Sequence, residues 1–148
     1  MADPTGSTGA EVPPEIPSKG QPAPVDVVKL VYSALGDPGR RKAAIAAVRA
    51  LTPRLKPEDW VVKVWAMAWY AQLGELDPAY DLADQLREQF VGQSPTNAWS
   101  WLWSREMRPF RRDARFEAFT TRLGLMDFWK QHVPPDDCDL QNGRLVCR

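Results

Sequence analysis

The stretch WVVKVWAMAWYAQL, residues 60–73, predicts how the rest of the chain is organised. Only Lys63 and Gln72 are strongly polar in it, so a helix here has no wide face for water. A helix that is apolar nearly all round is normally buried on several sides. At about 1.5 Å per residue it spans roughly 21 Å, which is too short for a hydrocarbon core of about 30 Å. We therefore predict the central helix of a soluble domain, covered on both flanks.

The composition indicates one domain without a strong charge. The 148 residues suffice for a sizeable core. Lysine plus arginine equals aspartate plus glutamate, at 19 each, so the charge gives no argument for nucleic acid or for an anionic membrane. Residues 1–24 hold six of the fourteen prolines and few apolar side chains, which predicts a disordered tail or linker. There is no early apolar run of the kind that a secretory signal needs.

Four X-Pro pairs mark expected helix starts, since proline is favoured at the first helical position. Asp and Ser before proline can also accept hydrogen bonds from free amides of the first turn. The pairs are Asp37-Pro38, Lys56-Pro57, Asp77-Pro78 and Ser94-Pro95. Together with apolar residues at helical spacing, they predict an all-α chain of antiparallel neighbours. The expected helices lie near residues 25–36, 38–51, 57–73, 78–91, 95–107, 113–123 and 125–131.

A short internal repeat accompanies this pattern. The segment 32–36, YSALG, recurs as YAQLG at 70–74, and each copy is expected to end a helix in a left-handed glycine. The chain here resembles a tetratricopeptide repeat, in which helix pairs recur at about 34 residues. Met67 stands where the family usually has glycine, and Lys63 where it usually has tryptophan. An unrelated helical bundle remains the alternative.

The C-terminal part carries a second resemblance. The segments MRPFRRDARFEAF at 107–119, RLGLMDFW at 122–129 and PPDDC at 134–138 are its most distinctive residues. They resemble the end of tetratricopeptide regions in bacterial membrane-anchored signalling proteins, of the winged-helix regulator, adenylate-cyclase or TolB-like-domain type. The resemblance covers roughly residues 57–148. It implies a helical accessory region and does not carry over the catalytic activity of neighbouring domains.

The segment CDLQNGRLVC, residues 138–147, predicts a β-hairpin. Asn142-Gly143 is a preferred pair for a two-residue type I′ turn. Pairing about this turn sets Cys138 opposite Cys147 at a non-hydrogen-bonded position, where Cα atoms approach closely enough for a disulfide. We expect residues 134–148 to form a cap on a helical repeat domain at 25–133. The disulfide indicates an oxidising compartment, most simply the bacterial periplasm, with a leader or anchor upstream.

The sequence gives little support for an enzyme. His132 is the only histidine, and Pro134-Pro135 separates it from Asp136 and Asp137. No glycine-rich phosphate loop occurs, and two cysteines with eight residues between them make a poor zinc site. We therefore expect no catalytic residues, no metal and no cofactor.

Three tryptophans alternate in the segment NAWSWLWS, residues 97–104. On an α-helix, Trp99 and Trp103 share a face and Trp101 points away from it. The simplest expectation places two of them in the core and one under the C-terminal segment. The alternative is an exposed Trp101 that anchors a partner, because aromatic side chains dominate binding hot spots.

Five arginines follow closely, with phenylalanines between them. One interpretation is that their stems cover apolar surface while their charged ends pair with Glu106, Asp113 and Glu117. The other is a nucleic-acid surface, which the neutral total charge disfavours. A sensor domain would use the same cluster to bind a small anion. The five are Arg105, Arg108, Arg111, Arg112 and Arg115.

These observations predict a tetratricopeptide-like array of helix pairs with a disulfide-closed hairpin. By analogy with the family, it binds a protein or peptide on the face lined by the first helices of each pair. The expected lining residues are Lys63, Met67, Tyr70, Trp101 and Arg108. The alternative is a small-anion or metabolite sensor that uses Arg105, Arg108, Arg111 and Arg112. Neither interpretation includes nucleic-acid binding or insertion of this chain into a membrane, and the oligomeric state stays open.

Overall fold

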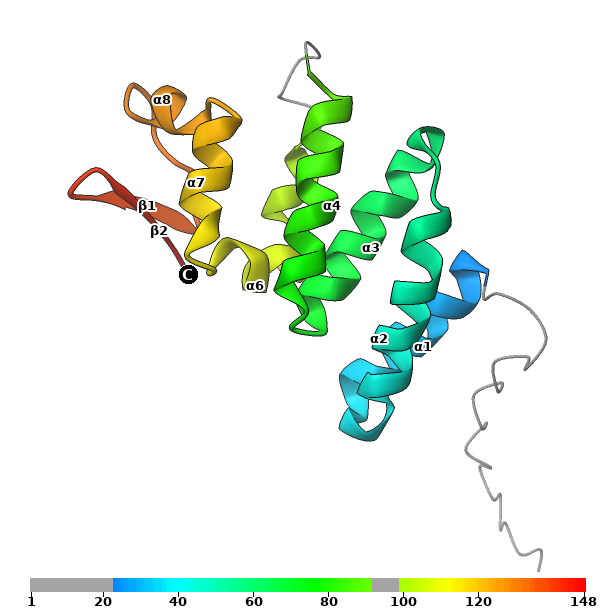
Figure 1. Cartoon of the computed structure of the whole chain (residues 1–148). Coiled ribbons are helices and arrows are strands. Elements are labelled where there is room, and N and C mark those ends of the chain that lie inside the picture. The colour runs from blue at the N-terminus through cyan, green and yellow to red at the C-terminus, as the bar shows by residue number, and fades with distance from the viewer. Residues whose placement is uncertain (1–22, 92–98) are drawn as a thin grey trace, which may run out of the picture.

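The fold is helical with one two-stranded hairpin, as predicted (Figure 1). A computed structural model describes residues 23–91 and 99–148. None of the described helices is both long enough and apolar enough to cross a membrane. The helices are α1 (Pro24–Gly36), α2 (Arg41–Leu51), α3 (Trp60–Gln72), α4 (Leu76–Gln89), α6 (Arg108–Arg111), α7 (Arg115–Arg122) and α8 (Leu125–Trp129), and the strands are β1 (Cys138–Gln141) and β2 (Arg144–Cys147).

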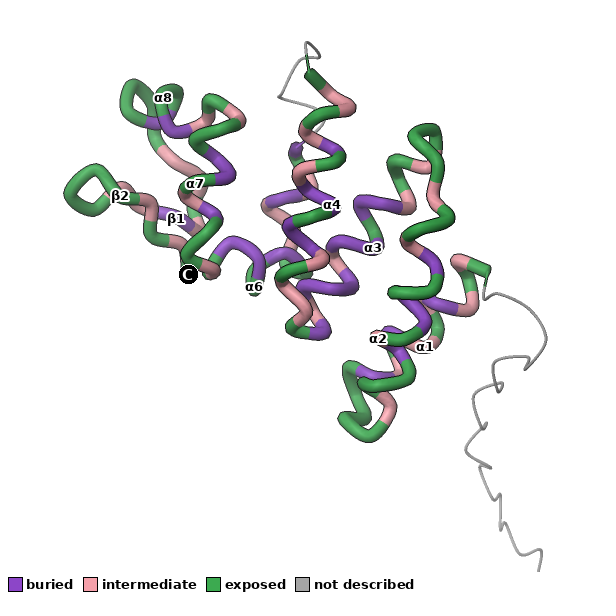
Figure 2. The backbone as a smooth tube through the Cα atoms, viewed as in Figure 1, coloured by how far each residue is buried: buried purple, intermediate pink, exposed green. Residues whose placement is uncertain are grey.

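Helix α3 lies in the middle of the molecule, as its composition predicts. The pairs α1–α2 and α3–α4 follow one another in Figure 1, and the C-terminal helices and hairpin lie beyond α4. Buried residues run through this middle region and form one continuous hydrophobic core (Figure 2). The predicted cover of α3 on both flanks is only partly observed, however. Trp60, Val61 and Trp65 are 40%, 39% and 49% exposed, so one apolar strip of α3 faces water.

The predicted capping by an aspartate before proline is observed at Asp37 but not at Asp77. The Asp37 carboxylate accepts a hydrogen bond from the Gly39 amide at 2.9 Å, as predicted for a residue before proline. The same prediction is wrong for Asp77. Helix α4 begins at Leu76, two residues before the expected start at Pro78, and the Asp77 carboxylate pairs with Arg115 instead of capping the helix.

The two glycines of the internal repeat also behave differently. Gly74 has a φ of 73° and ends α3, with the Glu75 amide bonded to the Tyr70 carbonyl and the Gly74 amide to that of Ala71. This pair of hydrogen bonds is the Schellman motif. Gly36 is not left-handed, so the prediction is wrong there. The chain leaves α1 through the extended residue Asp37, whose amide bonds back to Ser33.

The expected helix over 95–107 is wrong where the structure describes it. Residues 100–107 form two 3₁₀ turns, Ser100–Trp103 and Arg105–Met107, and the short helix α6 then follows, which the sequence analysis missed. A 3₁₀ turn places side chains differently from an α-helix, since it has about three residues per turn. Residues 95–98 and 1–22 lie outside the described residues, and so does almost all of the predicted tail.

The hairpin has the predicted register, with Cys138 opposite Cys147 and Gln141 opposite Arg144. Asn142 and Gly143 have φ values of 53° and 77°, as a type I′ turn requires. The cysteines form a disulfide, and their Cα atoms are 4.0 Å apart. The Leu145 amide donates to the Glu117 carboxylate at 2.8 Å, which joins the hairpin to α7. The disulfide prediction is therefore confirmed.

Removing this disulfide is expected to lower the free energy of unfolding by about 2–3 kcal/mol, because the loop that it closes regains conformational freedom in the unfolded chain. The test is urea unfolding, followed by tryptophan fluorescence, of the oxidised protein and of the Cys138→Ser/Cys147→Ser variant. The reducing agent alone should shift the wild-type curve and leave that of the variant unchanged. Coincident curves for wild type and variant contradict the prediction.

Candidate partner-binding groove

An apolar groove runs between the outer faces of α1 and α3. Its volume is about 420 Å³, and its most exposed aromatic side chains are Tyr32 and Trp65, at 59% and 49%. Exposed aromatic residues gathered in one groove are unusual on a soluble monomer and typical of interaction sites. The groove is lined by Val28, Tyr32, Val64, Trp65, Ala68, Trp69, Gln72, Trp101, Ser104, Glu106 and Met107.

The groove exists because α1 and α3 each carry two apolar faces. On α1, the inner face holds Val27, Val31 and Ala34, which are buried. The outer face of α1 holds residues 25, 28, 32 and 35, and that of α3 holds residues 61, 65 and 68, with the polar Gln72 at its end. Both sets recur at helical spacing, so each forms a stripe along its helix. The described elements cover the inner faces fully and leave much of the outer stripes accessible.

The tryptophan segment forms one wall of this groove. Trp101 is half-buried and lines it, with its ring 5.5 Å from that of the buried Trp99. Trp103 lies elsewhere, with its ring 5.6 Å from that of Trp129 in α8. The prediction that Trp99 and Trp103 share a face is therefore wrong, because the segment is a 3₁₀ turn. The sequence analysis expected one unspecified tryptophan under the C-terminal segment, and in the structure Trp103 is the one that contacts α8.

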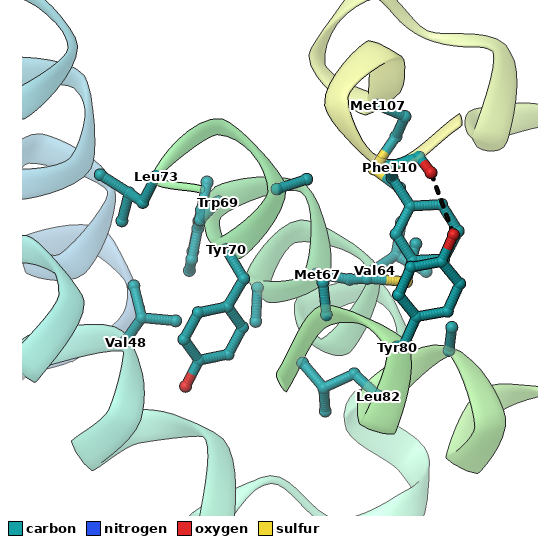
Figure 3. Close-up of a cluster of buried hydrophobic side chains, with 14 of the residues drawn as sticks. Val48, Val64, Met67, Trp69, Tyr70, Leu73, Tyr80, Leu82, Met107 and Phe110 are labelled. Carbon is teal, nitrogen blue, oxygen red and sulfur yellow. Dashed lines mark hydrogen bonds between the residues drawn. The ribbon is translucent and has the colours of Figure 1, made fainter. Parts of the chain in front are cut away.

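Three of the five expected lining residues are in the core instead. Met67 and Tyr70 lie in the cluster of buried side chains drawn in Figure 3. They are 0% and 2% exposed, and Lys63 is 7% exposed. The Tyr70 hydroxyl lies 3.2 Å from that of Thr52, at the end of the preceding helix pair. A partner surface therefore cannot rest on these three residues. Trp101 lines the groove, and Arg108 lines a neighbouring cleft.

That neighbouring cleft is basic. Its volume is about 650 Å³, and it contains the exposed side chains of Arg105, Arg108 and Arg112. Gln72 and Glu106 line both cavities, so the apolar groove continues directly into this arginine cleft. The remaining lining residues are Leu35 and Pro109.

Arg111 does not belong to the arginine cleft, which corrects the expected anion site. Its side chain is buried and donates to the carbonyl oxygens of Leu102 and Ser104 at 2.7 and 2.8 Å. It also pairs with the Asp137 carboxylate at 2.6 Å, next to the start of the hairpin. Burial lowers the pKa of its guanidinium, and Asp137 opposes this shift. Arg111 thus connects the tryptophan segment to the hairpin.

Arg115 is also engaged within the protein. It pairs with Asp113 at 2.8 Å and with Asp77 at 2.7 Å, and its guanidinium lies over the ring of Tyr80. The hydrogen bond from Arg115 holds the pKa of the Asp113 carboxyl below its usual value. The predicted pairing of arginines with nearby carboxylates is therefore confirmed for Asp113. Glu117 instead lies 3.6 Å from Arg144 of the hairpin.

The side chains around His132 have separate partners. The His132 ring stacks on Phe128 at 4.1 Å between centroids, and its Nδ1 lies 3.1 Å from the Phe128 carbonyl oxygen. Asp137 is bound to Arg111. This region therefore offers a stacked surface ring and an ion pair.

Sequence reasoning missed Tyr32 and Trp65 as groove residues. It treated Tyr32 as a repeat position equivalent to Tyr70, although the structure exposes the first and buries the second. The signal that was available is the second apolar stripe on each helix, at residues 25–35 and 61–72. Comparisons of the chain with protein-family models, with curated proteins and with solved structures find no match.

Proposed function

We propose that this chain is a non-enzymatic module that binds a segment of another protein in the α1–α3 groove. The observation that carries the proposal is the pairing of Tyr32 and Trp65, two half-exposed aromatic rings on neighbouring helices, in one groove. Burying such rings on binding releases a large apolar area from water. The partner that fits is a peptide segment with large apolar side chains.

The order of the helices supports a tetratricopeptide-like scaffold as the setting of this groove. The first helices of the two described pairs, α1 and α3, line the groove, and their second helices, α2 and α4, pack behind them. This is the face that the resemblance in the sequence assigns to partners. We extend the proposal to an accessory region of a bacterial envelope or signalling assembly.

An extracytoplasmic location is part of the same proposal. The disulfide between Cys138 and Cys147 supports it, since such bonds persist in oxidising compartments such as the periplasm. The hairpin that the disulfide closes is also bonded to α7 through Glu117, so the disulfide lies in a part of the fold that contacts the helices. The measurement is the thiol content of the protein after rapid alkylation in its native cells.

The test of the groove starts with peptides selected from a random display library on the immobilised, oxidised protein. Selected peptides should contain at least two large apolar residues. Their Kd, measured by fluorescence anisotropy, should rise at least about 30-fold in the Tyr32→Ser/Trp65→Ser variant, because buried aromatic hot spots each contribute about 2 kcal/mol or more. Both residues are half-exposed and lie outside the buried core, so the variant should keep its helical circular dichroism.

The matched control is Phe128→Ser, which removes an aromatic ring that is 53% exposed on α8 and does not line the groove. Peptide affinity should stay within about twofold of wild type in this variant. If no peptide is selected, or if the groove variant binds as well as the control, the proposed function is wrong.

A further inference from the structure

The arginine cleft has an unusual share of unpaired positive charge. Other described arginines have partners within the protein: Arg49 pairs with Glu75, Arg115 with Asp113 and Arg122 with Asp84. Among the residues that the structure describes, no carboxylate lies within ion-pair distance of Arg105, Arg108 or Arg112. Yet these three side chains share one cleft.

Their positions concentrate this charge on one side of the chain. Residues 105, 108 and 112 are spaced three and four apart: the first lies in a 3₁₀ turn, the second begins α6 and the third directly follows it. Like charges at such spacing repel one another. Glu106 is the only carboxylate among the lining residues, so the cleft keeps a positive balance. An anion that enters it relieves this repulsion.

The nearby end of α3 does not explain the cluster. Arginines are often attracted to the free carbonyl groups at a helix C-terminus. Here the carbonyls of Tyr70 and Ala71 accept the amides of Glu75 and Gly74, and the Leu73 carbonyl accepts a hydrogen bond from Arg41. Three carbonyl groups at this end of α3 thus have donors of their own. The three arginines of the cleft are left for a ligand.

We propose that the arginine cleft binds a carboxylate carried by the same peptide segment whose apolar side chains occupy the groove. The two cavities meet at Gln72 and Glu106, so one segment can enter both. Guanidinium groups bind carboxylates through paired, charge-assisted hydrogen bonds. This inference rests on the proposed function and adds the chemistry of the partner: large apolar residues and a carboxylate in the same segment.

The experiment uses the selected peptides and two protein variants with equal loss of charge. Arg105→Gln/Arg108→Gln changes the cleft, and Arg40→Gln/Arg144→Gln removes two arginines outside both cavities, the first half-buried and the second exposed. Wild-type protein should select peptides enriched in Asp or Glu, or with an essential free C-terminus. The cleft variant should weaken their binding about tenfold or more, and the control variant should change it less than about threefold.

Peptide variants identify which carboxylate enters the cleft. C-terminal amidation tests the terminal carboxylate, and Glu→Gln or Asp→Asn exchanges test side chains. The decisive exchange should weaken binding to wild type about tenfold and have little further effect on the cleft variant. Selected peptides without any essential carboxylate, bound equally by both protein variants, overturn the inference but leave the groove intact.

Calorimetry with citrate alone, on wild type and the cleft variant, distinguishes a free anion from a carboxylate on the peptide. Weak binding that competes with the peptide supports the proposal. Saturable citrate binding that depends on Arg105 and Arg108 but does not displace the peptide overturns it in favour of a small-anion sensor. Peptide binding by the Tyr32→Ser/Trp65→Ser variant tests the proposed groove and does not test the arginine cleft.

Discussion

Replacing Arg111 with methionine is expected to lower the free energy of unfolding by about 3 kcal/mol, which is the lower end of the range for breaking a buried ion pair. Arg111 is only 2% exposed, although it is a charged residue. Its guanidinium holds the carbonyls of Leu102 and Ser104 and the carboxylate of Asp137. Methionine has similar length and fills the space, but it satisfies none of these acceptors.

The expected decrease in the free energy of unfolding lies at the lower end of the range for buried ion pairs because Asp137 is 43% exposed. Water can therefore solvate its carboxylate after the exchange. The two carbonyls and the connection to the hairpin account for most of the effect. Urea unfolding with a tryptophan signal measures it, since Trp103 lies 5.9 Å from the Arg111 guanidinium. Hydrogen exchange at the Leu145 amide, which anchors the hairpin to Glu117, should also accelerate.

The matched control is Arg112→Met, the same exchange at the next residue. Arg112 is exposed, so its replacement should change stability by less than about 0.5 kcal/mol. Arg111→Lys provides an intermediate case, because one ammonium group keeps the charge but cannot reproduce the forked geometry. Equal stability of the Arg111→Met and Arg112→Met variants contradicts the structural role of Arg111.

The contrast between Arg111 and Arg112 explains one limit of the sequence analysis. Five arginines lie close together in the sequence, and residue type alone does not distinguish them. In an α-helix, a rotation of about 100° separates each residue from the next. That rotation places Arg111 inside and Arg112 in the cleft. Which of them turns inward depends on the 3₁₀ turns before α6, and these were predicted as one α-helix.

Features that depend on adjacent residues were predicted well. The hairpin register follows from the Asn-Gly turn and from pairing outward to the cysteines, all within ten residues of chain. The central place of α3 follows from its composition, because only burial accommodates so many apolar side chains. These inferences needed no knowledge of distant contacts.

Features that depend on distant packing were not predicted. Tyr32 and Tyr70 begin the same short repeat, but only Tyr70 has an earlier helix pair to pack against, through Thr52. Among the described residues, α1 belongs to the first pair, so nothing covers Tyr32 in the same way. Likewise, α1 and α3 each have two apolar faces, and the sequence does not say which one the core takes.

Replacing Phe119 with alanine is expected to be the most destabilising of the exchanges considered, by about 3–5 kcal/mol. Phe119 is 0% exposed, and its ring centroid lies 6.1 Å from that of Tyr80, 5.6 Å from Trp99 and 5.7 Å from Phe110. These edge-to-face contacts join α7 to α4, α6 and the tryptophan segment. Alanine leaves a cavity at the point where these elements meet.

The control for this exchange is Phe128→Ala, which removes the same ring from a site that is 53% exposed and should cost less than about 1 kcal/mol. Phe119→Leu should recover part of the loss, because it fills much of the cavity. The measurement is urea unfolding of the oxidised protein. If Phe119 joins the C-terminal helices to the helix pairs, Phe119→Ala should weaken amide protection in α7 and in the hairpin before it does so in α3. A uniform loss of protection, or stability equal to that of Phe128→Ala, contradicts this role for Phe119.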